Sequence, residues 1–158
     1  MIRNVHERRF DVPAERVGGL IDRLSSDDDP LWPRDRWPAM RLDGPLAVGA
    51  RGGHGPIRYS VTSYQLGRGV TFAFAPDLGL VGEHRLEVER LGGGTIVRHV
   101  LEGRTEGAMR LEWPLAFRWL HDALVEDALD RAEGLPPRRL GLWVRLLRRW
   151  AVRRGRSA

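Results

Sequence analysis

Histidine is the side chain best suited to acid–base chemistry near neutral pH. The chain has five histidines, at positions 6, 54, 84, 99 and 121. In residues 83–89, His84 falls on the apolar side of an alternating pattern, and in residues 95–102 His99 does the same. A buried imidazole must be hydrogen-bonded or bind something. We therefore expect each of these two histidines to be a ligand-orienting donor, a general acid–base group or a satisfied core histidine.

Other chemical motifs are missing from the sequence. There is no Cys, and so no thiolate nucleophile, disulfide or thiolate metal site. The histidines show no paired spacing or adjacent carboxylate pattern typical of a metal site, so we expect neither a metal nor a cofactor. No Gly-x-Ser-x-Gly elbow occurs, and the glycine-rich residues 49–56 lack the Lys-Ser/Thr end of a phosphate loop. Catalytic residues therefore stay unassigned.

Aromatic side chains accompany the histidines on the inward face. Alternation directs rings inward from residues 57–66 and 70–74, and a helical stripe over residues 113–128 supplies others. Apolar surface with a few polar groups is typical of a small-molecule site, although inward aromatic rings also fill ordinary cores. The expected ligand-binding residues are Tyr59, Phe72, Phe74, His84, His99, Trp113, Phe117 and His121.

The elements that must position these residues begin with a strand at residues 3–10. A helix follows, with Asp11 suited to cap it and Pro13 to its first turn, and residues 25–30 stop it. The next segment, residues 31–46, is rich in Trp and Pro and predicts no long helix, only a short helical turn at residues 37–41. Its two Trp-Pro pairs are consistent with a lid over a pocket or with a rigid surface segment.

A meander and two helices complete the prediction. Short apolar runs, the first at residues 46–51, alternate with glycine turns such as Gly52-Gly53 up to residue 104. This pattern predicts one antiparallel sheet. A helical stripe over residues 109–133 is expected to lie across the sheet and to end at residues 134–137. A second helical pattern covers residues 140–152.

This order resembles the START and birch-pollen-allergen-like (SRPBCC) superfamily, and within it the polyketide cyclase/dehydrase-like branch. The resemblance covers residues 3–133 and depends on residues 10–17, 48–50 and 119–124, which read FDVPAERV, VGA and WLHDAL. It implies an α+β helix-grip fold in which a curved antiparallel sheet of about six strands wraps around a long C-terminal helix, with a short N-terminal helix after the first strand. It also implies a cavity for an apolar or amphipathic small molecule. The superfamily shares no catalytic constellation, so the resemblance transfers no catalytic residue.

The positive charge is concentrated at the C-terminal end. Residues 138–158 contain eight Arg and no acid, which leaves 18 basic against 21 acidic residues, a net charge of −3, in residues 1–137. We expect a ligand-binding domain over residues 1–135 and a basic amphipathic extension over residues 136–158. Contact of residues 138–156 with an anionic membrane is one interpretation, and packing on its own domain, on a partner or on nucleic acid are the others. The expected membrane-contact residues are Trp143, Arg145, Arg148, Arg149 and Trp150.

Length and composition limit the function classes. A chain of 158 residues with 42% hydrophobic and 30% charged residues fits one globular domain. It has no apolar run long enough to span a membrane and no secretory signal pattern. We therefore expect a cytoplasmic protein, with peripheral membrane contact through the basic extension. An acidic body makes nucleic acid an unfavoured partner. The predicted function is binding of an apolar or amphipathic small molecule, and the alternatives are a cyclase/dehydratase-like acid–base enzyme and a ligand-free interaction module.

Overall fold

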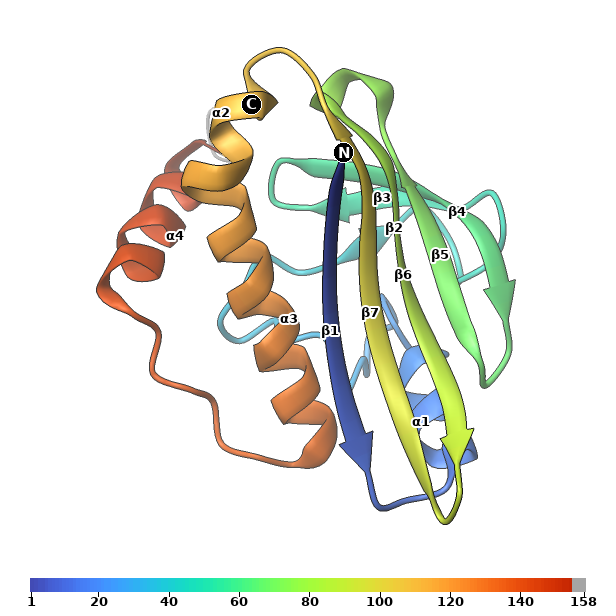
Figure 1. The fold of residues 1–158 in the computed structure, drawn as a ribbon. Coiled ribbons are helices and arrows are strands. Elements are labelled where there is room, and N and C mark those ends of the chain that lie inside the picture. The colour runs from blue at the N-terminus through green and yellow to red at the C-terminus, as the bar shows by residue number, and fades with distance from the viewer. Residues whose placement is uncertain (155–158) are drawn as a thin grey trace.

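A seven-stranded antiparallel sheet forms the body of the protein (Figure 1). The computed structural model describes residues 1–154, and for residues 150–154 it describes the backbone alone. The strand order across the sheet is β1-β7-β6-β5-β4-β3-β2, so every neighbour except the β1–β7 pair is consecutive in the chain. The strands are β1 (Ile2–Phe10), β2 (Arg41–Leu42), β3 (Arg51–His54), β4 (Ile57–Gln65), β5 (Gly69–Phe74), β6 (Leu80–Leu91) and β7 (Gly94–Thr105).

A long helical rod lies along one face of this sheet, beside β1 (Figure 1). It begins as α2 (Met109–Glu112), continues through the π-helical turn η2 (Trp113–Phe117) and becomes α3 (Arg118–Glu133). Pro114 explains the wide turn, because an interior proline has no N–H and crowds the preceding turn. Gly134, with φ of 77°, caps the rod in the left-handed conformation. The fold class, a helix-grip α+β fold with one antiparallel sheet, is therefore confirmed.

Two further helices and a 3-10 turn complete the fold. The short helix α1 (Ala14–Ile21) follows β1, the 3-10 turn η1 (Pro76–Leu78) precedes β6, and α4 (Leu142–Arg154) runs beside the rod on the side away from the sheet (Figure 1). Within the described residues, no helix has both the length and the apolar character needed to cross a membrane.

Several local predictions at the start of the meander are wrong. Residues 46–50 are irregular, with a turn at residues 48–49, and the strand begins at Arg51. Gly52 and Gly53 lie inside β3, where a Cβ atom on Gly52 would stand 1.9 Å from the carbonyl oxygen of Arg41 on the neighbouring strand. These glycines therefore permit close approach of β2 and β4, and the turn itself falls at Gly55-Pro56.

Two predictions near the N-terminal helix are also wrong. The side chain of Asp11 does not cap α1; Pro13 occupies the N-cap position and no side-chain cap is formed. No helical turn forms at residues 37–41, since the turn in this segment lies earlier, at residues 34–36. Pro38 explains the second error, because a proline disfavours helical backbone at the residue before it.

The C-terminal helix packs on its own domain through one face. Leu147 is buried against Trp37 and Leu120, and Val144 packs partly on the same cluster. Arg138, just before this helix, forms hydrogen bonds to both carboxylate oxygens of Asp130 on α3, at 2.5 and 2.9 Å. Part of the basic extension is thus bound to the acidic body.

Candidate functional site

A cavity of about 150 Å³ lies between the inner face of the sheet, the rod, α1 and residues 31–40. The described part of its lining is almost entirely apolar, with four imidazoles and one guanidinium as the polar exceptions. The enclosed part of this cavity can hold about one aromatic ring, and because the cavity is partly open to solvent the rest of a larger ligand can extend outward. The inner faces of β5, β6 and β7 supply one wall because alternate side chains of each strand point the same way.

Seven of the eight residues expected to bind a ligand line this cavity. They are Phe72, Phe74, His84, His99, Trp113, Phe117 and His121. Tyr59 lies behind the lining instead, with its ring centroid 5.0 Å from that of Phe72 and 5.1 Å from that of His84. Its hydroxyl lies 3.1 Å from Nδ1 of His54. A binding role for these eight residues stays a prediction.

The histidines follow one another along the cavity wall. The ring of His84 stacks against Phe72 and Phe74, with centroid distances of 5.0 and 4.9 Å. His99 lies 5.5 Å from His84, and His121 lies 4.9 Å from His99. Within the described part of the chain, three ring nitrogens in this series are buried without a hydrogen-bond partner: Nε2 of His84, Nδ1 of His99 and Nε2 of His121.

Burial keeps these imidazoles neutral. Desolvation lowers the pKa of His84 and His99 well below the ordinary value of 6.5, and nearby histidines add to the effect. The same cause lowers the pKa of His54 to about 3. A neutral imidazole has one N–H donor and one acceptor nitrogen. Each unpartnered nitrogen is therefore a free donor or acceptor facing an apolar interior.

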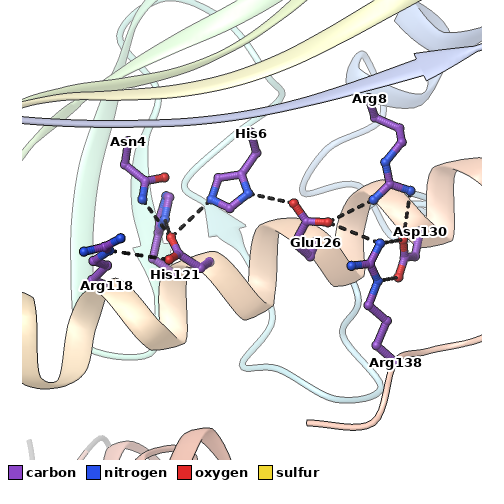
Figure 2. A network of polar contacts seen from close by, with 9 residues as sticks. Asn4, His6, Arg8, Arg118, His121, Glu126, Asp130 and Arg138 are labelled. Carbon is purple, nitrogen blue, oxygen red and sulfur yellow. Dashed lines mark hydrogen bonds and ion pairs between the residues drawn. The ribbon is translucent and has the colours of Figure 1, made fainter. Parts of the chain in front are cut away.

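A polar network joins the cavity wall to the first strand (Figure 2). Its centre is Asp122 on α3, whose Oδ1 accepts a hydrogen bond from Nδ2 of Asn4 at 2.8 Å. Nε2 of His6 lies 3.2 Å from the same oxygen, and Nδ1 of His121 lies 3.4 Å from it. Nδ1 of His6 contacts Oε1 of Glu126 at 2.7 Å. His6 is therefore held between two carboxylates.

The charges of this network follow from its contacts. Burial disfavours the charged form of His6, but the contacts with Asp122 and Glu126 outweigh it and raise the pKa of His6. Burial likewise opposes ionisation of Asp122, yet hydrogen bonds from His121, His6 and Asn4 hold the pKa of this carboxyl well below its usual range. An imidazolium between two carboxylates is thus the favoured state. Arg8 extends the network from Glu126 to Asp130 at 2.9 Å each.

His6, His121 and Asp122 are also the one group of described residues whose ligand atoms converge enough to hold a metal ion, within 4.8 Å of one another. Their hydrogen bonds do not fit that use. A metal needs a lone pair on a neutral imidazole, whereas both nitrogens of His6 contact carboxylates and its pKa is raised. We interpret the group as an ion-paired network.

Sequence reasoning missed several of these participants, among them His6, Asp122 and the cavity role of Arg148. The signal for His6 was present, since Asn4, His6 and Arg8 alternate with exposed residues along β1. Asp122 simply follows His121 in the chain, but only the pairing of β1 with β7 brings His6 to it. The sequence predicts membrane contact for Arg148, whereas in the structure its side chain lines the cavity. Its Cζ lies 5.8 Å from the ring centroid of Trp37.

The Trp/Pro-rich segment forms a fixed wall of the cavity. The indole N–H of Trp37 donates to Oδ2 of Asp127 at 2.7 Å, and Arg36 donates to Oδ1 of the same buried carboxylate at 2.8 Å. The indole N–H of Trp32 donates to the carbonyl oxygen of Pro38 at 2.9 Å. Both indoles line the cavity. Their fixed partners favour the rigid-segment interpretation of residues 31–40.

Several solved structures share this fold at low sequence identity. CalU16 from Micromonospora echinospora is 16% identical, with a TM-score of 0.59 over 98% of this chain and 86% of that one. A protein from Nitrosospira multiformis is 13% identical, with a TM-score of 0.62 over 84% and 94%. The Aha1 dimer protein from Colwellia psychrerythraea is 20% identical, with a TM-score of 0.50 over 78% and 96%. No protein-family model and no curated protein matches the sequence. These likenesses agree with the helix-grip fold expected from the sequence.

Proposed function

We propose that the protein binds an apolar or amphipathic small molecule in the internal cavity. One observation carries the proposal: within the residues that the structure describes, three buried imidazole nitrogens have no hydrogen-bond partner, and they belong to residues that line a mainly apolar space. A protein that only fills its core leaves few buried polar atoms unsatisfied, because each costs about 1–3 kcal/mol. A ligand with a polar group opposite these nitrogens would recover that cost.

The chemistry of the cavity favours a particular kind of ligand. Neutral imidazoles in an apolar wall supply single donors and acceptors and no net charge, so the deeply bound group is itself neutral, such as a hydroxyl or a carbonyl. Stacked rings around His84 favour an aromatic body. Among the lining residues that the structure describes, Arg148 alone has a permanent positive charge, so an acidic substituent would be favoured on the side near Trp37.

Displacement of a neutral fluorescent probe tests the proposal. N-phenylnaphthylamine should gain fluorescence in the wild-type protein and be displaced by small phenols and aromatic ketones. Phe117→Gln places a polar side chain in the lining and should weaken binding about tenfold or more. Phe117 is only half-buried, so this variant should fold. The matched control is Leu111→Gln, which changes an exposed residue of the same rod. Equal binding by both variants would reject the cavity as the binding site.

A second function is favoured by the exposed surface of the helices. Leu142, Trp143 and Leu146 on α4 are 70%, 51% and 48% exposed. On the rod, Leu111, Leu115 and Trp119 are also exposed, and the indole N–H of Trp143 donates to the carbonyl oxygen of Leu115 at 3.2 Å. The two exposed apolar strips, here called the leucine-tryptophan patch, therefore adjoin.

We propose that this patch docks on an anionic lipid surface. Exposed arginines flank it on both helices: Arg110 and Arg118 on the rod, Arg145 and Arg149 on α4. An apolar strip with indoles and guanidinium groups at its border suits the interface of an anionic bilayer. The membrane face so defined keeps Trp143, Arg145 and Arg149 of the sequence-based prediction. Arg148 is not part of this face, because its side chain lines the cavity. The prediction for Trp150 falls on a side chain outside the described residues.

A further inference from the structure

We propose that His121, oriented by Asp122, is a proton acceptor in the wall of the cavity and allows the protein to remove a proton from a bound carbon acid. The inference rests on the proposed function, because the substrate must occupy the same cavity. The expected substrate class is a small aromatic ketone or a related heterocycle with an acidic C–H group.

The orientation of His121 is the first step of the argument. Its Nδ1 faces Oδ1 of Asp122 at 3.4 Å, so this nitrogen carries the hydrogen when the carboxylate is ionised. The lone pair then belongs to Nε2, which is buried without a partner in the described part of the chain. His121 lines the cavity. A free acceptor nitrogen on a carboxylate-oriented imidazole is the arrangement of a general base.

The surroundings of Asp122 are the second step. Asn4 donates to Oδ1 at 2.8 Å, and Arg118 on the same helix lies 3.7 Å from Oδ2 (Figure 2). His6 lies 3.2 Å from Oδ1. These contacts keep the carboxylate ionised and fixed in position. When His121 accepts a proton, the adjacent carboxylate stabilises the imidazolium that forms. Asp122 is therefore a positioning residue, and it acts through His121.

The other cavity histidines have a different role in this proposal. Among the described residues, no hydrogen bond or ion pair joins His84 or His99 to a carboxylate, so neither is oriented as a base. His99 lies next to His121, with 4.9 Å between ring centroids. In its neutral form it can donate one N–H to a substrate oxygen that gains negative charge. The substrate C–H bond then breaks, an N–H bond forms on Nε2 of His121, and the electron pair moves to the substrate oxygen as an enolate.

Ring opening of 5-nitrobenzisoxazole tests the base directly. A base removes the proton from the ring carbon, its electron pair forms the nitrile, and the N–O bond breaks to release a coloured phenolate. The reaction needs no cofactor and no second substrate. We expect the wild-type protein to accelerate it at least about tenfold over buffer at the same pH. His121→Gln should lose this acceleration and still bind N-phenylnaphthylamine, and Arg104→Gln, an exposed change on β7, should leave it unaltered.

Asp122→Asn separates positioning from a structural role. It should lower kcat about tenfold and leave KM within about twofold, because the substrate does not touch Asp122. Loss of the carboxylate should also lower the pKa of His121 and move the pH profile to lower pH. The charged and titratable groups around His121 and Asp122 are Arg118 on their helix and four histidines of the sheet, at positions 6, 54, 84 and 99. All of them stay in place in Asp122→Asn.

Three outcomes overturn the inference without touching the proposed function. One is a wild-type protein that binds the probe and shows no acceleration. Another is a His121→Gln variant that folds and keeps the wild-type rate. The third is loss of activity in a chelator, which would point to a metal on His6, His121 and Asp122. If His121→Gln does not fold, NMR of the wild-type protein with nitrogen-labelled histidine decides the matter. A hydrogen on Nδ1 of His121 supports the inference, and a hydrogen on Nε2 rejects it.

Discussion

Nε2 of His6 lies 3.2 Å from Oδ1 of Asp122, across 116 residues of sequence. This contact joins the strand at one edge of the sheet to the rod that covers it. Asp122 also contacts His121, which lines the cavity. The same carboxylate therefore links the strand–helix interface to the wall of the cavity. The stability of the strand–helix interface and the protonation state of His121 are therefore coupled through Asp122.

The first prediction concerns the pH dependence of this contact. The pKa of His6 is raised in the folded protein above its ordinary value of 6.5. Its contribution to the free energy of unfolding is therefore fully present below pH 6.5 and is lost as the pH rises through the folded-state pKa. His6→Gln should be less stable than wild type, and the difference should shrink above pH 6.5.

Urea unfolding followed by circular dichroism at several pH values measures this difference. Arg3→Gln is a suitable control, because Arg3 lies on the opposite face of the same strand and pairs with exposed Glu102. A stability difference for His6→Gln that stays constant from mildly acidic to alkaline pH would contradict a charged His6.

The second prediction concerns the buried cavity histidines. Burial lowers the pKa of His84 and His99, so the unfolded chain binds more protons than the folded protein below pH 6.5. Stability should fall as the pH drops from 6.5, by up to about 1.4 kcal/mol per pH unit for each fully buried imidazole. His99→Gln should show a shallower acid slope than wild type, and unfolding midpoints between neutral and mildly acidic pH will measure it. An unchanged slope would mean that His99 is not neutral in the fold.

The third prediction concerns the anchors of the Trp/Pro-rich wall. Trp37→Phe keeps an aromatic six-membered ring but removes the indole N–H that donates to the buried carboxylate of Asp127, and should cost at least about 2 kcal/mol of stability. Trp32→Phe is the matched control, since its indole donates to a neutral carbonyl oxygen and should cost only about 1 kcal/mol. Equal losses in thermal or urea unfolding would show that the charge of Asp127 does not strengthen the Trp37 bond.

Hydrophobic periodicity in the sequence was sufficient to predict the sheet and the rod, because it indicates which face of each element is buried. The alternation that placed His84 and His99 inward is a property of each strand alone, and the helical stripe from Trp113 to Leu124 is a property of the rod alone. Both kinds of pattern survive folding because one face of each element meets the core.

Contacts between distant elements could not be predicted in the same way. The partner of Asp122 depends on β1 pairing with β7, which places His6 opposite His99 in the sheet. From the sequence, Gly52 and Gly53 predict a turn, because glycine is typical both of turns and of close backbone approach. Only the neighbouring carbonyl of Arg41 distinguishes the two cases. The sequence likewise did not determine what the apolar stripe of α4 packs against, since such a stripe suits a membrane surface and its own domain equally well.

The last prediction separates the two faces of α4. Trp143→Ala removes an exposed indole from the leucine-tryptophan patch, and should weaken binding to anionic vesicles with little loss of stability. Leu147→Ala removes a buried side chain, and should cost about 2–5 kcal/mol of stability while leaving the patch in place. Arg149→Gln should weaken vesicle binding by about 1 kcal/mol, and added salt should reduce that difference.

Vesicle sedimentation with anionic and neutral lipids measures the first and third effects, and urea unfolding measures the second. Point substitutions are preferable to deletion of residues 138–158, because deletion also removes Arg138 from Asp130 and Leu147 from the core. If Trp143→Ala and Arg149→Gln bind anionic vesicles as wild type does, the patch is not a lipid-binding surface. If the wild-type protein binds neutral and anionic vesicles equally, the arginines around the patch do not select its partner.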